Sequence, residues 1–85
     1  MYELKTTKKF DKIFVKLTKK DPIQANSIIK KIEQILKNPE HFKPLRANMK
    51  GVRRVHIDSS FVLIYEIKGR FVILLDYDHH DNIYE

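Results

Sequence analysis

The sequence predicts an α+β fold in which an N-terminal helical hairpin packs on one face of a small antiparallel β-sheet. Two observations carry this prediction. Up to residue 38, apolar residues recur at intervals of three and four, which is the period of an amphipathic helix. After residue 51 they alternate or run together, as in strands. The 85 residues suffice for one small domain, so we expect a single domain over residues 1–85.

The chain begins with a weakly alternating segment that leads into a helix. Residues 2–6 are compatible with a short first strand. Thr6 or Thr7 then offers a hydroxyl that caps the first turn of the helix. The apolar side of this helix follows the i, i+3, i+4, i+7 spacing at Phe10, Ile13, Phe14 and Leu17. We expect this side to face the core.

A second helix begins at Asp21 and Pro22. Asp21 is suited to the N-cap, and Pro22 to the first helical position, where its missing N–H is not needed. The apolar face of this helix is formed by Ala25, Ile28, Ile29, Ile32, Ile35 and Leu36. Pro39 ends the helix, because the residue before a proline disfavours the helical conformation. With a connection of about three residues, the two helices are expected to form an antiparallel hairpin.

After Gly51 the side-chain period becomes that of a strand. Val55 and Ile57 are expected on one face, and the polar row Arg54, His56 and Asp58 on the other. Two nearly continuous apolar strands follow, over residues 61–67 and 71–77, with a hairpin turn at Lys68–Gly69. Such apolar strands are typical of the middle of a sheet covered on both faces.

The charge balance indicates a polyanionic partner. Seventeen Lys and Arg residues against eleven Asp and Glu residues give a net charge of +6, which favours RNA or DNA as the ligand. A soluble lysine-rich domain without such a partner is the alternative. Lys43, Arg46 and Lys50 lie in a predicted loop over residues 40–51. Cations on a loop reach a phosphate backbone more readily than cations fixed along a helix.

The composition excludes several functional classes. The chain has no cysteine, which excludes a disulfide framework, a thiolate nucleophile and a Cys-based zinc site. No apolar run approaches the roughly 18 residues of a membrane span, and the N-terminus lacks the apolar core of a signal peptide. We therefore expect a cytoplasmic protein. No glycine-rich phosphate loop is present, and no cofactor is expected.

Two groups of residues are suited to chemistry. Arg54 and His56 share one face of a strand, so a cation that holds a phosphate would lie beside an imidazole that moves a proton near neutral pH. An ordinary polar strand face is the alternative. Near the C-terminus, Asp76, Asp78 and His80 would share a face if the strand continued, and such donors could bind a metal. The other interpretation makes His80 a general acid or base beside Tyr84, provided that the tail packs on the sheet.

The segment KGVRRVHIDSSFVLIYEI, residues 50–67, resembles the RelE/ParE superfamily of small toxins from type II toxin–antitoxin systems, and within it the YafQ-type mRNA-cleaving toxins. The resemblance lies in the placing of two histidines and two aromatic residues, His56, His80, Phe61 and Tyr84, and in the Leu-Ile-Tyr sequence that ends at Tyr65. The helical hairpin before this segment extends the resemblance to essentially the whole chain, which implies a RelE-like fold.

The resemblance implies a ribosome-dependent mRNA endoribonuclease that inhibits translation and is held inactive by a small, acidic, helical antitoxin. In such an enzyme the ribose 2′-OH attacks the adjacent phosphate without a metal ion. His80 and His56 would share the proton transfers, Arg54 would stabilise the developing charge, and Tyr84 or Phe61 would stack on a base of the message in the ribosomal A site. The residues assigned to RNA binding are Lys43, Arg46, Lys50, Arg53, Ser60 and Phe61.

The chain departs from these families at several positions, Arg54 and Asp76 among them. Arg54 replaces an acidic residue of YafQ-type toxins and a lysine of RelE, and Asp76 stands where both kinds carry an arginine on the last strand. These departures leave open a weakly active, a differently organised or an inactive site. The alternatives are thus a ParE-like toxin that binds DNA gyrase and cleaves nothing, or a degenerate toxin that acts as a binding and corepressor module.

Overall fold

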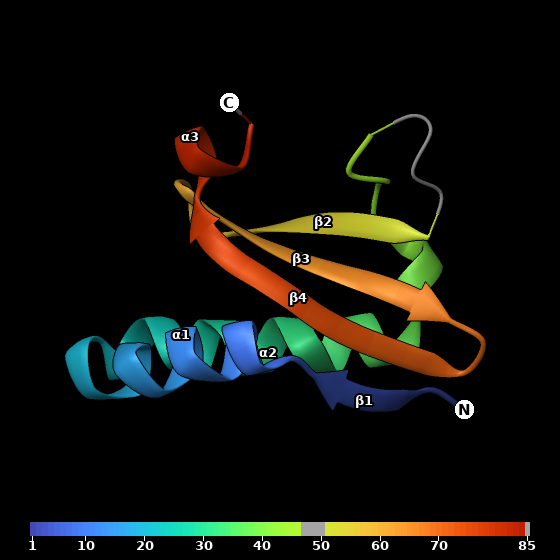
Figure 1. Cartoon of the computed structure of the whole chain (residues 1–85), viewed down its shortest axis with the longest axis horizontal. Coiled ribbons are helices and arrows are strands. Elements are labelled where there is room, and N and C mark those ends of the chain that lie inside the picture. Colours follow the sequence, from blue (N-terminus) through green and yellow to red (C-terminus); the bar gives the residue numbers. More distant parts are fainter. Residues whose placement is uncertain (47–50, 85) are drawn as a thin grey trace.

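The computed structural model describes residues 1–46 and 51–84, and it shows a pair of helices beneath a twisted sheet (Figure 1). The elements follow in the order β1 (Glu3–Thr6), α1 (Lys8–Lys20), α2 (Pro22–Lys37), the 3₁₀ turn η1 (Pro39–His41), β2 (Val52–Ile57), β3 (Phe61–Lys68), β4 (Phe71–His79) and α3 (His80–Ile83). The predicted α+β class, with a helical hairpin on one side of a sheet, is confirmed.

The first helix begins where a threonine joins it to the sheet. Thr7 is the N-cap of α1, and its Oγ1 accepts a hydrogen bond from the Phe10 N–H at 3.2 Å. The same hydroxyl donates to the Leu74 carbonyl oxygen of β4 at 3.0 Å. Of the two threonines expected as the cap, Thr7 takes the role, and it fixes the start of α1 against β4.

The second helix begins and ends at the expected residues. The Asp21 carboxylate accepts from the Gln24 N–H at 3.1 Å, Pro22 is the first helical residue, and Asn38 closes the C-terminus. Asp21 alone separates α1 from α2, so the connection is shorter than the three residues expected. The chain therefore reverses sharply, and the helices run side by side in opposite directions (Figure 1).

The sheet is mixed, with the strand order β1-β4-β3-β2. The three strands β2, β3 and β4 are antiparallel, as expected from their short connections. The short first strand is also present, but it pairs in parallel with β4, from Glu3 opposite Phe71 to Thr6 opposite Leu74. A parallel pair requires a long connection, and here both helices and two strands lie between β1 and β4 in the sequence.

The core lies between the sheet and the helical pair. It is formed by Phe10, Ile28, Ile35, Val55, Ile57, Leu63, Tyr65, Val72, Leu74 and Tyr77. Most of these were expected from the apolar periodicity, whereas Ile29 of the predicted face is 43% exposed. The Tyr65 hydroxyl donates a 2.5 Å hydrogen bond to the Pro39 carbonyl oxygen. This bond ties the centre of the sheet to the turn that ends α2.

The opposite face of the sheet carries a second, smaller buried surface. Val62 and Ile64 of β3 are almost inaccessible to solvent although they lie on the face of the sheet opposite the core. On β2 they lie opposite His56 and Arg54, and on β4 opposite Asp78 and Asp76. These polar neighbours and α3 therefore stand around an apolar centre, which explains why β3 is apolar on both faces.

Two turns use left-handed backbone. Gly69 has a φ of 57° in the two-residue connection between β3 and β4, a conformation that glycine adopts without steric cost. Asp58 has a φ of 55° between β2 and β3, where aspartate is among the residues that tolerate it. Within residues 1–46 and 51–84, no helix is both long and apolar enough to cross a bilayer.

Candidate functional site

Four side chains gather at one end of the sheet, and we call them the histidine cluster: Arg54 and His56 of β2, His80 of α3, and Tyr84 just after it. The rings of His56 and His80 stack, with centroids 5.8 Å apart and an interplanar angle of 23°. The His80 and Tyr84 ring centroids lie 4.6 Å apart, and the Arg54 guanidinium carbon lies 5.8 Å from the centre of the Tyr84 ring. The four residues that sequence and resemblance single out for catalysis are therefore neighbours.

The position of His80 depends on the end of β4. The His80 N–H donates to the Ser60 carbonyl oxygen at 2.7 Å, which joins α3 to the turn before β3. His79 is the N-cap of α3, and its Nδ1 accepts from the Asp81 N–H at 3.2 Å. The strand thus ends at His79, two residues beyond the predicted strand, and it does not continue through His80 as the metal hypothesis requires. The helical turn carries the His80 ring over the exposed face and stacks it on His56.

The cluster is open to solvent on its outer side. His56 is exposed, and about half of the His80 side chain is accessible. An imidazole accepts a proton when it is neutral and donates one when it is protonated, so two adjacent imidazoles can supply both a base and an acid. Arg54 adds a permanent positive charge with a fork of N–H donors. This combination is suited to a reaction in which a proton moves and negative charge develops on a phosphate.

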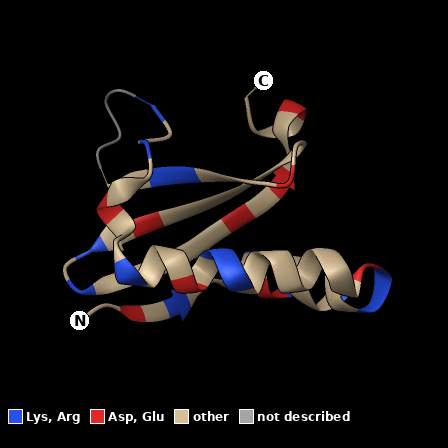
Figure 2. Cartoon of the chain, turned by 180° about the vertical axis from the view of Figure 1, so that it is seen from behind, with Lys and Arg blue, Asp and Glu red and all other residues tan. Residues whose placement is uncertain are grey.

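The aspartates of β4 are held by other groups. Asp76 forms an ion pair with Lys9 at 3.0 Å and accepts from the Tyr77 N–H at 2.8 Å. Asp78 accepts from the His79 N–H at 2.7 Å and from the Asn82 side-chain amide at 3.1 Å. Figure 2 shows basic residues in blue on β2 and acidic residues in red on β3 and β4.

The hypothesis of a metal site at Asp76, Asp78 and His80 is not supported by the structure. Among residues 1–46 and 51–84, no group of three His, Cys, Asp or Glu side chains is arranged to hold a metal ion. The reason is the turn of the backbone into α3, which takes His80 off the strand face that was expected to align it with the two carboxylates.

Arg53 does not join the histidine cluster. It pairs with Tyr65 and so lies on the helix-facing side of the sheet. Its Nη1 donates to the Phe42 carbonyl oxygen at 2.6 Å and to the Glu40 carbonyl oxygen at 3.3 Å. The guanidinium of Arg53 therefore holds the loop after α2 in place, and the assignment of Arg53 to RNA binding stays a prediction.

Phe61 also lies on the helix-facing side. Its ring stacks on Tyr77 at 5.4 Å and packs against the core, so it is not available to stack on a base beside His56. Ser60 contributes its carbonyl oxygen to the placement of His80, and its Oγ lies 3.5 Å from that of Ser59. Of the two aromatic candidates for stacking, the structure brings only Tyr84 to the cluster.

The loop after α2 forms a basic cavity beside His56, with a volume of about 550 Å³. Its lining residues are Lys31, His41, Phe42, Lys43, Arg54, Val55 and His56. Lys43 is one of the residues expected near RNA, whereas no pattern in the sequence singles out Lys31. Arg46 is exposed at the end of the described part of the loop, and Lys50 lies outside the described residues.

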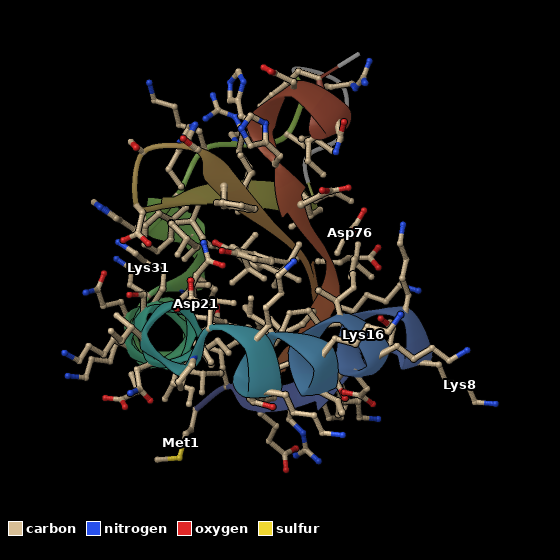
Figure 3. All side chains as sticks on the ribbon, turned by 90° about the vertical axis from the view of Figure 1, so that its left-hand side faces the viewer. Met1, Lys8, Lys16, Asp21, Lys31 and Asp76 are labelled. Carbon is tan, nitrogen blue, oxygen red and sulfur yellow. The ribbon has the colours of Figure 1, made fainter. Side chains whose placement is uncertain are left out.

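A second hollow lies between α1 and the edge of β4, and we call it the hairpin groove. It measures about 670 Å³, and its lining residues are Lys9, Ile13, Lys16, Leu17, Lys20, Asp21, Gln24, Phe61, Asp76, Tyr77 and Asp78. Figure 3 labels Lys16 and Asp76 on its two sides and Lys31 away from it. The buried Tyr77 hydroxyl has no hydrogen-bond partner among the described residues. Burial, and then the charges of Asp58 and Asp21, strongly raise the pKa of this phenol.

Comparison with known proteins agrees with the architecture. Residues 2–84 match the family described as ParE toxin of type II toxin–antitoxin system, parDE. A Methanocaldococcus jannaschii protein named "Putative toxin RelE4" is 46% identical over 87 residues, which cover 100% of this chain and 93% of that protein.

Two solved structures share the fold at low sequence identity. The YoeB/ParE toxin from Agrobacterium tumefaciens superposes with a TM-score of 0.78 at 17% identity, over 94% of this chain and 99% of that one. The Escherichia coli DinJ–YafQ toxin–antitoxin complex gives 0.72 at 21% identity, over 99% and 98%. Together with the family match over residues 2–84, these findings establish that the chain belongs to the ParE toxin family, within the RelE/ParE superfamily of type II toxin–antitoxin systems.

Proposed function

We propose that this toxin is an endoribonuclease that cleaves messenger RNA on the ribosome. The observation that carries the proposal is the stacking of His56 on His80 at 5.8 Å with Arg54 and Tyr84 beside them. Acid, base and cation are the three groups that cleavage of RNA by its own 2′-hydroxyl requires.

In the proposed reaction one imidazole accepts the proton of the ribose 2′-OH while that oxygen attacks the adjacent phosphorus. The bond from phosphorus to the 5′ oxygen of the next nucleotide breaks, and the other imidazole donates a proton to this oxygen. The products are a 2′,3′-cyclic phosphate and a 5′-hydroxyl. The reaction therefore consumes no water, and it requires no metal ion. His56 and His80 fill the two roles in either order, because both rings face the same open side of the sheet.

Arg54 and Tyr84 have supporting roles in this proposal. The Arg54 guanidinium stabilises the negative charge that develops on the phosphate oxygens. Tyr84 offers a ring on which a base of the message can stack, which is how proteins commonly hold unpaired bases of RNA. The ion pair between Lys9 and Asp76 supports the proposal, since it offsets a carboxylate charge that would otherwise repel the phosphate.

The test is cleavage of a defined message on translating ribosomes, mapped by primer extension at the codon in the A site. Wild-type protein is expected to cut, and the double variant His56→Ala/His80→Ala is expected to leave the message intact. His79→Asn is the matched control, because it retains an N-cap side chain while changing a neighbouring histidine outside the cluster. Absence of cleavage by the wild type, or undiminished cleavage by the double variant, would overturn the proposal.

A gyrase-binding toxin without nuclease activity is the second candidate, and the ParE family match favours it. A supercoiling assay with purified DNA gyrase separates the two, because inhibition of supercoiling with intact messages would select this candidate. A toxin that does neither but still represses transcription together with its antitoxin would be the degenerate corepressor.

We further propose that an acidic, helical antitoxin binds in the hairpin groove. The floor of the groove is apolar, through residues such as Leu17 and Phe61, and the cations of α1 stand along its rim. An amphipathic helix with an acidic flank complements both features. The toxin–antitoxin complex of YafQ with DinJ supports an antitoxin as the partner.

Charge reversal at the rim tests this site. Lys16→Glu is expected to slow association with the antitoxin encoded beside the toxin gene, and to weaken the dependence of that rate on salt. Lys8→Glu is the matched control, since Lys8 lies on the same helix outside the groove (Figure 3). Equal association rates for the two variants would place the antitoxin elsewhere.

A further inference from the structure

The basic cavity beside His56 contains Lys31, His41 and Lys43, to which the catalytic proposal assigns no role. Three separate segments supply its cations: Lys31 comes from α2, Lys43 from the loop, and Arg54 from β2. His41 lies at the end of η1 and adds an imidazole. No acidic side chain is among the described residues that line the cavity.

The cations of the cavity are available to a ligand. Within the described ranges, none of Lys31, Lys43 and Arg54 takes part in a salt bridge. The buried Nε of Arg54 likewise has no hydrogen-bond partner among the described residues. A concentration of positive charge without an internal counter-ion favours an anion, because each cation then lacks a competing carboxylate.

The loop that carries His41 and Lys43 is fastened to β2. The Arg54 N–H donates to the Lys43 carbonyl oxygen at 3.1 Å, and Pro44 forms a bridge with Arg53. The Arg53 guanidinium holds the carbonyl oxygens of Glu40 and Phe42 from the core side. The positions of the loop cations are thus set before a ligand arrives, which lowers the entropic cost of binding.

The cavity and the histidine cluster share two residues. His56 lines the cavity and stacks on His80, and Arg54 lines the cavity and lies against the Tyr84 ring. An anion in the cavity is therefore next to any phosphate that reacts at the cluster. In a nucleic acid strand, the group that occupies such a position is the neighbouring phosphate of the same backbone.

We propose that the basic cavity binds a backbone phosphate of single-stranded RNA that flanks the scissile phosphate, with Lys31 as the cation supplied by the helical layer. This inference rests on the proposed nuclease function and extends it. Lys31, His41 and Lys43 are positioning residues in this scheme. They hold the strand so that the next phosphate lies beside the stacked rings of His56 and His80, and they take no part in proton transfer.

Binding of a fluorescent single-stranded RNA with 2′-O-methyl riboses, which block cleavage, tests the inference. Lys31→Ala is expected to weaken binding about tenfold at low salt and to reduce the slope of log K against log salt by about 0.7, the value for one phosphate contact on a single strand. The matched control is Lys30→Ala, since Lys30 precedes Lys31 on α2 but does not line the cavity. On ribosomes, Lys31→Ala is expected to raise KM while kcat is retained.

The outcomes distinguish this inference from the nuclease proposal. If Lys31→Ala and Lys30→Ala have the same affinity and salt slope, the cavity is not a phosphate site, even where the histidine variants abolish cleavage. If Lys31→Ala weakens RNA binding but the wild type cleaves no message, the cavity binds RNA and the nuclease proposal fails alone. If Lys31→Ala weakens the binding of duplex DNA but leaves the binding of RNA unchanged, the inference is overturned in favour of a DNA ligand. Failure of the wild type to bind the RNA at low salt would also overturn the inference.

Discussion

The rings of His56 and His80 stack 5.8 Å apart although one belongs to the edge strand of the sheet and the other to the helical turn after the last strand. Nothing in the local sequence around either histidine produces this contact. It depends on the pairing of Val62 with both His56 and Asp78 across β3, and on the hydrogen bond from the His80 N–H to Ser60.

Single substitutions of the two histidines are expected to be nearly as damaging as the double one. His56→Ala and His80→Ala should each lower kcat by about 10²–10⁴-fold, the usual contribution of a positioned acid or base. The double variant should lose less than the product of the two effects, because the groups act as a unit. Single-turnover cleavage on ribosomes measures all three. Fully multiplicative losses would show that the imidazoles act independently.

Tyr84 is expected to act through its ring. Tyr84→Phe keeps the surface that packs on His80 and faces Arg54, so cleavage should stay within about threefold of wild type, whereas Tyr84→Ala should lose on the order of tenfold or more from the missing stacking energy. Cleavage rates of the two variants, with urea titrations to compare their stabilities, check this. A Tyr84→Phe variant as inactive as Tyr84→Ala would assign the role to the hydroxyl instead.

Tyr65→Phe is expected to destabilise the protein. The variant leaves the buried Pro39 carbonyl oxygen without its donor, which should lower the free energy of unfolding by about 1–2 kcal/mol at pH 7. Burial raises the pKa of Tyr65 to about 12. The folded state therefore keeps this proton more tightly than the unfolded state, whose tyrosines ionise near 10.

Because the folded state raises the pKa of Tyr65, the free energy of unfolding should decrease in alkaline solution. The stability contributed by Tyr65 is complete below pH 10 and is lost as the pH rises towards 12. Between pH 9 and pH 11 the wild type should lose about 1 kcal/mol more than Tyr65→Phe. Urea denaturation at the two pH values measures this difference. Parallel pH dependence in the two proteins would contradict the assignment.

Tyr77→Phe is expected to have the opposite effect on the free toxin. The Tyr77 hydroxyl is buried without a hydrogen-bond partner among the described residues, so its removal eliminates a desolvation cost. The free energy of unfolding should stay the same or rise by about 1 kcal/mol. The same urea titration measures it, with Tyr65→Phe as the matched comparison. A loss above 1 kcal/mol would mean that the hydroxyl has a partner in solution.

Much of the fold could be predicted because its determinants are local. The caps at Thr7 and Asp21, the proline that ends α2 and the alternation around Val55 each act within a few residues of the feature that they produce. The parallel pairing of β1 with β4 could not be predicted in this way. Nothing in the sequence of residues 3–6 or 71–74 indicates that the two segments pair, or which residues lie opposite one another.

The candidate site was predictable only in part, for the same reason. The face of Arg54 and His56 follows from strand alternation, but the sides on which Arg53 and Phe61 lie depend on which face the helices cover. Lys31 is indistinguishable in the sequence from the other lysines of the helices. Only the folded chain brings it to the loop that carries Lys43.

The parallel pairing of β1 with β4 also has a consequence for the order of folding. The helical hairpin is complete by Lys37, but its apolar side packs against strands that come later in the chain, and β1 gains its neighbour only when residues 71–74 have formed. At about 5–20 residues per second of synthesis, the nascent chain exposes that apolar surface for a time on the order of seconds. The pairing of β1 with β4 closes a loop over most of the chain, which makes it a slow final step. Until this step is complete, the unfinished molecule is most exposed to aggregation and to proteolysis.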